Sequence, residues 1–368
     1  MRRVRIGIVS PYSLTLPGGV QGQVLSLART LRSLGHDVRV LGPCDGPPPD
    51  PGVTPLGKSL PLASNGSIAP IAPDVSATLR TLRALRDEEF DVVHLHEPFV
   101  PGPTQTALLL RPAPIVGTFH AAGDLPAYQI VRPLVLAAAK RIDVRVAVSD
   151  DAAESARRNI GGDYELLFNA VDLAEFAGAR PTPSDGPTIF FLGRHEERKG
   201  LGVLLDAVRR LGPDVRVWIG SDGPQTDELK AATSGDPRIE WLGRIDDGVK
   251  AARLAGATVF CAPSLSGESF GVVLLEAMAA GTPVVASDLP GYAKVARHGQ
   301  DAVLVPPGDA PALAEALAAV LSSATEQQRL IAAGHERAAG FSMEQLAQRY
   351  LELYALAIER ARHGVEVA

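Results

Sequence analysis

The sequence predicts an α/β protein made of two doubly wound parallel-sheet domains that face a central cleft. Three observations predict this class. Short apolar runs alternate with longer helical patterns along the whole chain, and strands joined by crossover helices form parallel sheets. The 368 residues are about twice the length of a typical domain. An irregular segment rich in Pro, Gly and Ser, 178–187, interrupts the alternation near the middle, as a linker between domains does.

The first half of the chain contains five apolar runs with the length of buried parallel strands. Helical patterns lie between them, and the pattern at 21–34 ends at Gly35, a residue that suits the left-handed backbone after a helix. The predicted strands are Val4–Ser10, Val38–Gly42, Asp91–Leu95, Pro114–Phe119 and Val144–Val148.

After the linker the alternation starts again and predicts a second sheet of the same kind. The predicted strands are Thr188–Leu192, Val215–Ile219, Ile239–Leu242, Ala257–Cys261, Pro283–Ala286 and Ala302–Val305. Helical patterns follow at 200–211, 270–280, 311–321, 326–339 and 343–361. We therefore expect Rossmann-like domains at 1–177 and 188–342, joined by the linker 178–187. Ligands of such sheets bind where the loops at the carboxyl ends of the strands converge.

Composition and charge exclude several classes of function. Hydrophobic residues make up 46% and charged residues 21%, the balance of a globular protein. The formal net charge of −6 argues against a nucleic-acid binder, which normally carries a basic field. Cys44 and Cys261 have no metal-ligand spacing, which favours a reducing compartment. No apolar run approaches the roughly 20 residues of a membrane span, and Pro11 interrupts the first one. We expect a cytoplasmic protein whose membrane contact is peripheral.

A glycine pair follows the first predicted strand. Pro17-Gly18-Gly19-Val20 leads directly into a helix, and a helix N-terminus with glycine offers free amides and close approach. This predicts a diphosphate site at Gly19, although a tight strand-to-helix turn explains the same residues. The G-x-G-x-x-G fingerprint is absent here, which disfavours a nicotinamide-dependent oxidoreductase.

Two cations follow the first strand of the second half. Arg194 comes directly after Gly193, and Lys199-Gly200 opens the next helix. A guanidinium fork and an ammonium point charge at the carboxyl edge of a sheet suit a diphosphate. Plain solvation of both side chains is the alternative.

Two carboxylates accompany an apolar helical pattern in the second half, one inside it and one just before it. Glu276 lies inside the run Val272–Ala277, and burial of a carboxylate requires a hydrogen-bonding partner. Glu276 therefore meets either a structural partner or ligand hydroxyls. Glu268 precedes the run, where capping of the helix also explains it. Eight helical residues correspond to ~12 Å of rise, too far for the ~5 Å carboxylate pair of a retaining glycosidase.

Several motifs occur together in one order. They are Pro17-Gly18-Gly19, Thr118-Phe119-His120, Gly193-Arg194 with Lys199-Gly200, Gly220-Ser221-Asp222-Gly223-Pro224, and Glu268-Ser269-Phe270-Gly271 through Glu276. Together they resemble a retaining GT-B glycosyltransferase of family GT4 over nearly the whole chain. More closely, the chain resembles the phosphatidylinositol mannosyltransferases. That resemblance rests on Ser10-Pro11-Tyr12-Ser13, Pro17 to Gln21, Asn65-Gly66-Ser67, His94-Leu95-His96-Glu97-Pro98 and Gly267 to Gly281.

The resemblance implies roles in donor binding. Arg194 and Lys199 hold the donor diphosphate and stabilise it as it leaves. Glu276 accepts the ribose hydroxyls. Glu268 and the amides of Phe270 and Gly271 hold the donor sugar and the nearby phosphate.

The resemblance also assigns groups to the base, the sugar and the acceptor. The base lies against Ile245, with Asp247 as a guanine contact, and Gly223 lies in a donor-binding loop. Gly19 approaches the diphosphate from the first domain. His120 faces the reacting sugar, although a strand-end histidine also serves as a plain structural hydrogen bonder. The acceptor residues are Tyr12, Gln21, Asn65 and Ser67. The helix in 343–368 packs back on the first domain.

The implied reaction moves mannose from GDP-mannose to phosphatidylinositol with retention of configuration. Fixed cations and amides stabilise the charge that grows on the diphosphate, and no carboxylate nucleophile is evident. No D-x-D motif occurs, so a Mg²⁺ requirement is not indicated, and no other cofactor is expected. A UDP-sugar donor with a soluble or another lipid acceptor stays open. So do a GT-B epimerase or phosphorylase and a catalytically inactive nucleotide-sugar-binding protein.

The segment 74–89 departs from the basic membrane-binding helix of the related enzymes. Arg80, Arg83 and Arg86 lie beside three acids, which weakens attraction to an anionic membrane. An apolar stripe at helical spacing accompanies them, formed by Leu79, Leu82 and Leu85. The segment therefore lies either on a membrane surface or against the sheet as an ordinary amphipathic helix.

Overall fold

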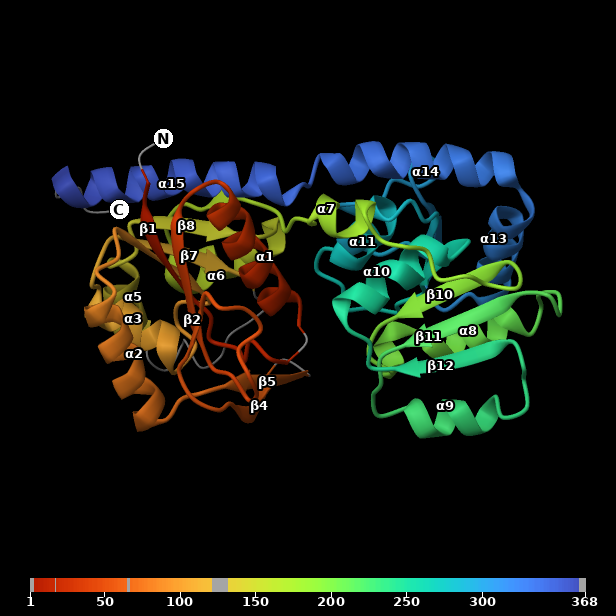
Figure 1. Cartoon of the computed structure of the whole chain (residues 1–368), viewed down its shortest axis with the longest axis horizontal. Coiled ribbons are helices and arrows are strands. Elements are labelled where there is room, and N and C mark those ends of the chain that lie inside the picture. Colours follow the sequence, from red (N-terminus) through yellow and green to blue (C-terminus); the bar gives the residue numbers. More distant parts are fainter. Residues whose placement is uncertain (1–2, 17, 65–66, 121–131, 364–368) are drawn as a thin grey trace. The chain divides into compact units, whose positions relative to one another are not determined.

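A computed structural model describes residues 3–16, 18–64, 67–120 and 132–363, without the side chains of 63, 64, 67 and 68. The chain forms two compact units (Figure 1). Unit 1 comprises Met1–Asn169 and Met343–Ala368, and unit 2 comprises Ala170–Ser342.

Unit 1 is built on a parallel sheet of seven strands in the order β3-β2-β1-β6-β7-β8-β9. The central strands β6 and β7 are buried along their whole length, because helices cover both faces. That explains why they occur in the sequence as apolar runs without alternation. The strands are β1 (Arg5–Val9), β2 (Asp37–Gly42), β3 (Val53–Pro55), β6 (Val92–His96), β7 (Ile115–Phe119), β8 (Val144–Ala147) and β9 (Glu165–Leu166).

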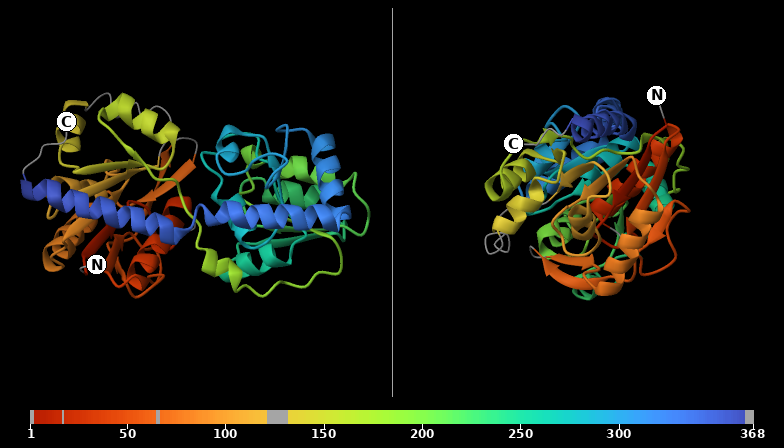
Figure 2. Two further views of the ribbon diagram at one scale, coloured as in Figure 1. Left: turned by 90° about the horizontal axis from the view of Figure 1, so that it is seen from above. Right: turned by 90° about the vertical axis from the view of Figure 1, so that its left-hand side faces the viewer.

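Two groups of helices cover the two faces of this sheet (Figures 1 and 2). α1 and α15 pack against each other on one face, and α2, α3, α5 and α6 bury a shared apolar core on the other. The helices are α1 (Gly19–Ser33), α2 (Val75–Asp87), α3 (Pro103–Leu110), α5 (Arg132–Ala139), α6 (Asp150–Ile160) and α15 (Met343–His363).

Helix α6 shows how local sequence sets the ends of these helices. The Ser149 hydroxyl accepts a hydrogen bond from the Ala152 amide at 3.1 Å, which satisfies one of the free N–H groups of the first turn. Acidic residues lie in the first turn and basic residues in the last. Both placements complement the helix dipole.

A small antiparallel hairpin, β4 (Leu60–Ser64) and β5 (Ser67–Ile71), stands apart from the main sheet. It is joined to the loop after β1 by a bridge between Tyr12 and Ile71. The Ser13 amide also donates to the Pro70 carbonyl at 2.9 Å. The hairpin thereby fixes the loop that carries Tyr12.

Unit 2 is built on a parallel sheet of six strands in the order β12-β11-β10-β13-β14-β15. Successive side chains of one strand enter two different cores: Phe190 packs in one and Phe191 in the other. The strands are β10 (Thr188–Leu192), β11 (Arg216–Gly220), β12 (Ile239–Gly243), β13 (Val259–Ala262), β14 (Val284–Ser287) and β15 (Val303–Val305).

The helices of unit 2 divide between those two cores. α8 and α13 close one, α7, α10 and α11 close the other, and α14 contributes to both. The helices are α7 (Leu173–Ala177), α8 (Leu201–Val208), α9 (Thr226–Ala232), α10 (Asp247–Gly256), α11 (Val272–Ala279), α12 (Pro290–Ala293), α13 (Ala310–Ser322) and α14 (Ala324–Ala339), with a 3₁₀ turn η1 (Glu197–Lys199).

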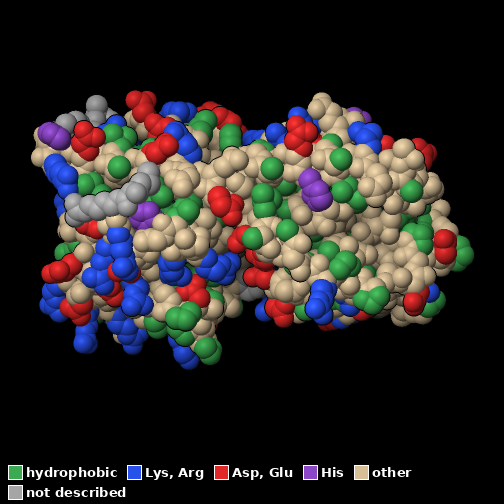
Figure 3. Space-filling model, turned by 45° about the horizontal axis from the view of Figure 1, so that its top comes forward, with side chains coloured by type: hydrophobic (Ala, Val, Ile, Leu, Met, Phe, Trp, Pro, Cys, Tyr) green, Lys and Arg blue, Asp and Glu red, His purple; other side chains and the backbone are tan. Residues whose placement is uncertain are grey.

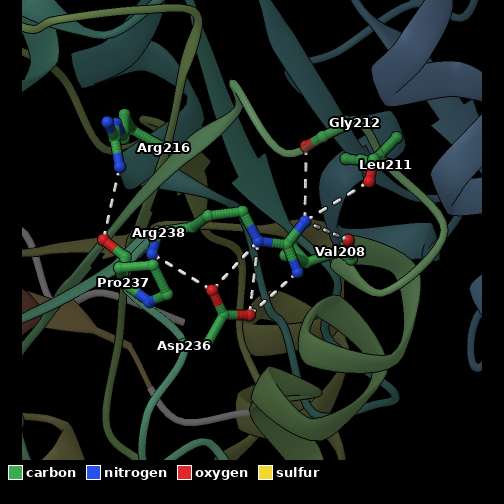
Figure 4. A network of polar contacts seen from close by, with 7 residues as sticks. All are labelled: Val208, Leu211, Gly212, Arg216, Asp236, Pro237 and Arg238. Atoms are coloured by element: carbon green, nitrogen blue, oxygen red, sulfur yellow. Dashed lines mark hydrogen bonds and ion pairs between the residues drawn. The ribbon is translucent and has the colours of Figure 1, made fainter.

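An arginine joins the end of α8 to the loop before β12 (Figure 4). The Arg238 guanidinium donates to the carbonyls of Val208, Leu211 and Gly212 at 3.0–3.3 Å. It also pairs with Asp236 at 2.8 Å, and this hydrogen bond raises the pKa of Arg238 and lowers that of Asp236. The cation satisfies carbonyls that a helix end leaves free.

Helix α15 is attached to the sheet of unit 1 by polar contacts as well as apolar ones. The Tyr354 hydroxyl lies 2.9 Å from His94 Nδ1, and the Tyr350 hydroxyl lies 3.0 Å from Thr118 Oγ1. Farther along the helix, Arg360 donates to the Asp143 carbonyl at 2.8 Å.

All eleven strands predicted from the sequence are present, with ends that differ by at most two residues. The short strands β3, β4, β5 and β9 were not predicted, because runs of two to five residues at an edge or in a hairpin give little apolar signal. The segment 178–187 has no regular secondary structure. The division between the units falls earlier, between Asn169 and Ala170.

Helix α2 differs from the apolar stripe expected for it. Leu85 is buried, together with Ala77 and Thr81, whereas Leu79 is 61% and Val75 is 75% exposed. The helix thus packs on unit 1 through one face and presents two large apolar side chains on another. Within the part of the chain that the structure describes, no helix combines the length and apolar character needed to cross a membrane.

Candidate functional site

Each sheet reverses its strand order at one point. In unit 1 the reversal lies between β1 and β6, and in unit 2 between β10 and β13. Ligands of open α/β sheets bind outside the carboxyl ends of the strands at such a point. The predicted residues follow these strands or their neighbours: Tyr12 and Gly19 after β1, His120 after β7, Arg194 and Lys199 after β10, and Glu268 after β13.

His120 is held from two sides. Its backbone amide donates to Glu97 Oε1 at 2.6 Å, and its Nε2 lies 2.8 Å from Nδ1 of His96. Burial lowers the pKa of His120 to about 4. The imidazole is therefore neutral at pH 7 and acts as a hydrogen-bonding group, not as a cation.

Glu97 has an unusual backbone conformation for its position. It directly follows β6 with a φ of 50°, in the left-handed region that non-glycine residues rarely occupy. Its carboxylate is buried. Burial and then the Glu97 charge raise the pKa of Tyr12 above its ordinary value. Strained backbone of this kind concentrates at functional sites.

A second layer of polar groups lies behind His96. His94 Nε2 is 2.7 Å from Thr118 Oγ1, which in turn contacts Tyr350. Burial lowers the pKa of His94 to about 3, and that of His96 also lies well below its usual value. These hydrogen bonds compensate the burial of neutral polar side chains.

A cavity of about 10 Å³ borders this group. This volume is at the lower limit for holding one water molecule. It is lined by Gln23, Leu27, His96, His120, Val148, Leu167, Asn169, Leu346 and Tyr350.

The other predicted residues of unit 1 lie around the start of α1 and the hairpin. A side chain at Gly19 would meet no described atom within 4 Å, whereas one at Gly18 would collide with the Gln21 amide. Gln21 is buried against that turn. Asn65 lies outside the described residues, and so does the side chain of Ser67, which begins β5.

In unit 2, Lys199 and Glu268 meet although 69 residues separate them. Lys199 Nζ lies 2.6 Å from Glu268 Oε1. The same oxygen accepts from the Ser264 hydroxyl at 3.0 Å, and Ser264 contacts the Tyr292 hydroxyl at 3.0 Å. The contacts bring the ends of β10 and β13 together in one charged cluster.

Arg194 is exposed beside this cluster. Its side chain makes no hydrogen bond or ion pair with any described residue. Arg198, by contrast, pairs with Glu196 at 2.6 Å and approaches Glu268 at 3.7 Å. An unengaged guanidinium at the carboxyl edge of a sheet can accept an anion in bidentate fashion.

Glu276 on α11 is paired with Lys250 on α10. Lys250 Nζ lies 2.9 Å from Glu276 Oε1 and 3.1 Å from Asp247 Oδ1. It also lies 5.6 Å from the centre of the Phe176 ring. Although burial alone lowers the pKa of Lys250, the two carboxylates raise it above its ordinary value. The Lys250 ammonium therefore stays charged.

Local packing explains the residue type at each of the remaining predicted donor positions. A Cβ at Gly223 would lie 2.6 Å from the His195 backbone, and one at Gly271, where φ is 98°, would lie 2.8 Å from the Tyr292 ring. The Phe270 side chain is part of the apolar core. Ile245 packs on the edge of the same core.

One detail of the expected geometry is wrong. Helix α11 begins at Val272 with Gly271 as its N-cap, so Glu268 lies in the preceding loop. The estimate of eight helical residues between Glu268 and Glu276 therefore does not apply. Sequence reasoning also assigned no role to Lys250, Ser264, Tyr292, His96 or Glu97. Only the motif His94–Pro98 singled out the last two.

Comparisons with known proteins identify the family of the chain. Residues 17–175 match the model "Glycosyltransferase Family 4", and residues 186–323 match "Glycosyl transferases group 1". The phosphatidyl-myo-inositol mannosyltransferase of Mycobacterium leprae is 40% identical, over 95% of this chain and 96% of that protein. The protein of the same name from Mycolicibacterium smegmatis is 38% identical, over 95% and 93%.

The chain belongs to glycosyltransferase family 4. Its fold is that of solved GT-B glycosyltransferases. The crystal structure of Anabaena HepE in complex with UDP and glucose superposes with a TM-score of 0.69, at 19% identity, over 96% of this chain and 100% of that one. The clusters around His120 and around Lys199 thus belong to a glycosyltransferase.

Proposed function

We propose that this glycosyltransferase transfers mannose from GDP-mannose to a hydroxyl of phosphatidylinositol, with retention of configuration. The observation that carries the proposal is the 40% identity over 95% of the chain to a protein named for that activity. The predicted motifs also occur in one order along nearly the whole chain.

The donor diphosphate is assigned to unit 2. Arg194 has no competing partner among the described residues, and Lys199 lies at the same edge with Glu268. A diphosphate that accepts from both cations leaves Glu268 free to accept sugar hydroxyls. The cations then stabilise the charge that develops as the sugar–phosphate bond breaks. The amides of Phe270 and Gly271 and the loop at Gly223 complete this assignment.

The contacts of α10 support guanine as the base. Guanine presents an acceptor at O6 and donors on its amino group. Asp247 is 75% exposed and can accept from those donors, and the neighbouring Lys250 can donate to O6. Uracil lacks the amino donors. Ile245 supplies apolar contact to the base, and Glu276 remains assigned to the ribose hydroxyls.

The surface of unit 1 supports a lipid acceptor. Of the described large apolar side chains that are exposed, all but Val249 lie in unit 1, including Leu60, Leu62 and Leu134. Figure 3 shows Lys and Arg side chains gathered on the unit 1 part of the face that it draws. Apolar and basic side chains together favour the surface of an anionic membrane. Tyr12, Gln21, Asn65 and Ser67 are assigned to the inositol headgroup.

The proposed reaction needs no protein nucleophile. The acceptor hydroxyl attacks from the face that the diphosphate leaves, and the leaving oxygen takes the hydroxyl proton. His120 contacts the sugar, and Gly19 allows close approach to the diphosphate. The chemistry therefore depends on positioning and on electrostatic stabilisation.

The test is transfer from labelled GDP-mannose to liposomes with phosphatidylinositol, followed by mass spectrometry of the lipid. A mannosylated phosphatidylinositol is the expected product. Liposomes with phosphatidylglycerol in its place keep the surface charge and should give none. Absence of product together with calorimetric GDP binding would move the acceptor elsewhere. Binding of UDP but not GDP would replace the donor.

A substitution tests the base assignment separately. Asp247→Ala removes one exposed carboxylate and should weaken GDP binding about 10-fold, since a good base contact contributes ~1–3 kcal/mol. Binding of UDP should not change. The exposed Asp206→Ala on α8 is the control. Equal losses for both nucleotides would contradict the guanine contact.

A further inference from the structure

A buried histidine, His96, and a partly buried one, His120, share a single hydrogen bond at the carboxyl edge of unit 1. His96 Nδ1 and His120 Nε2 lie 2.8 Å apart, and the rings are stacked with centroids 5.1 Å apart. Burial lowers the pKa of both. A neutral imidazole carries one N–H and one bare nitrogen. The contact therefore has two possible arrangements.

The second nitrogen of His96 distinguishes these arrangements. His96 is 2% exposed, and its Nε2 has no hydrogen-bond partner among the described residues. If His120 donates, His96 must carry its own proton on this Nε2 and leave a buried N–H without an acceptor. If His96 donates, Nε2 is only an unmet acceptor. Orphaned buried N–H groups are the rarer case in proteins.

The neighbouring cavity does not change this conclusion. Its volume of about 10 Å³ is at the lower limit for one water, which also needs two to four polar partners. Most of the surface that the cavity exposes is apolar, from Leu27, Val148, Leu167 and Leu346, although Gln23, Asn169 and Tyr350 also line it. The cavity therefore offers little to stabilise an N–H group there.

We propose that His96 is a positioning residue that donates its Nδ1 proton to Nε2 of His120 and so keeps the ring proton of His120 on Nδ1. The inference rests on the proposed function, in which His120 contacts the sugar. Glu97 holds the backbone amide of His120 at 2.6 Å, so the backbone and the ring are both fixed. His120 then offers the substrate a hydrogen-bond donor and cannot act as a general base. That role matches a reaction in which the leaving diphosphate takes the proton.

The first test reads the tautomer directly. Long-range ¹H–¹⁵N spectra of the full chain labelled at histidine distinguish protonated from bare ring nitrogens, and His96 and His120 variants assign the signals. We expect both histidines to be protonated on Nδ1 and bare on Nε2. A proton on Nε2 of His120 would overturn the proposal. This measurement needs no donor or acceptor, so it stands even if GDP-mannose or phosphatidylinositol is the wrong substrate.

The second test separates positioning from folding. His96→Gln leaves no donor near the Nδ1 position, and kcat should fall about 10–100-fold, as for other residues that orient a functional imidazole. The KM for GDP-mannose and the melting temperature should change little. His96→Asn keeps an amide N–H near that position and should lose about 10-fold less. If kcat fell equally in the two variants, and the melting temperature also fell equally, the role of His96 would be purely structural.

His94→Gln is the matched control. His94 is equally buried and its ring lies 4.3 Å from that of His96, but it bonds to Tyr354 and Thr118. The substitution should lower the melting temperature and leave the protonated nitrogen of His120 unchanged. If the wild type transfers no mannose, the proposed function fails while the spectra still decide the role of His96.

Discussion

At the scale of single residues, unit 2 contains two ion pairs that are assigned to different parts of the donor. Lys199 pairs with Glu268 at the edge of the sheet, and Lys250 pairs with Glu276 beside α11. The first pair is assigned to the diphosphate and sugar, the second to the base and ribose. The Lys199 and Glu268 side chains are only 21% and 11% exposed, so removal of one partner leaves a partly buried charge and some loss of stability accompanies the loss of function.

Lys199→Ala and Glu268→Ala should each reduce kcat at least about 100-fold, since loss of one group that stabilises developing charge costs 10²–10³. The melting temperature should change by only a few degrees. The control is Arg209→Ala, which breaks an exposed pair with Asp206 on α8 and should leave transfer unchanged. Unaltered turnover in both site variants would remove Lys199 and Glu268 from the site.

The buried histidines predict how stability depends on pH. Burial lowers the pKa of His94 to about 3 and of His120 to about 4, from 6.5 in the unfolded chain. The unfolded chain therefore binds protons first as the pH falls. The free energy of unfolding therefore decreases as the pH falls from about 6.5 to 4. Each histidine contributes up to ~1.4 kcal/mol of this decrease per pH unit. Urea unfolding at pH 7.5, 6.5 and 5.5 measures this slope.

His94→Gln should make that slope shallower, because one titrating group is lost. A free energy of unfolding that stays constant between pH 7.5 and 5.5 would show that these histidines have the same pKa in the folded protein as in the unfolded chain.

At the scale of elements, α15 is the longest helix among the described residues, and hydroxyl groups attach it to the sheet of unit 1. Tyr350 and Tyr354 lie one turn apart on its buried face. They reach Thr118 and His94 on two neighbouring strands. These polar contacts require a single register of the helix, whereas apolar contacts alone tolerate small shifts.

Tyr354→Phe tests this attachment. It removes the hydroxyl 2.9 Å from His94 Nδ1 and should lower the free energy of unfolding by about 1–3 kcal/mol, the cost of leaving a buried polar atom unpaired. Arg349→Ala, on the exposed side of the same helix, breaks only a surface pair with Glu352. It should cost no more than ~1 kcal/mol. Equal effects of the two variants would contradict a specific role for the hydroxyl.

At the scale of the whole molecule, two units carry separate apolar cores. Unit 1 closes its core with a helix from the far end of the chain, whereas unit 2 is continuous in sequence. Domains that have their own cores can unfold as separate cooperative units.

Calorimetry should therefore resolve two thermal transitions. Phe260→Ala should lower only that of unit 2, and Leu95→Ala only that of unit 1, because each deletes a fully buried side chain from one core at about 2–5 kcal/mol. A ligand stabilises the unit that binds it, so GDP should raise the transition that Phe260→Ala lowers. A shift of the other transition alone would place donor binding in unit 1.

Much of this molecule follows from its sequence. Apolar runs determined eleven of the strands, and the signal is clearest for the central ones, because strands covered on both faces must be apolar on both sides. The motifs located Arg194, Lys199, Glu268 and His120 at strand ends. Short edge strands were missed, because few of their side chains are buried and they leave no periodic signal.

What only the tertiary structure decided is how distant side chains meet. Lys199 meets Glu268 over 69 residues, Lys250 meets Glu276 over 26, and His94 meets Tyr354 over 260. A sequence shows that a buried carboxylate or histidine needs a partner, but many residues offer the same chemistry. The partner is chosen by strand order and helix packing, which bring two points of the chain within hydrogen-bonding distance.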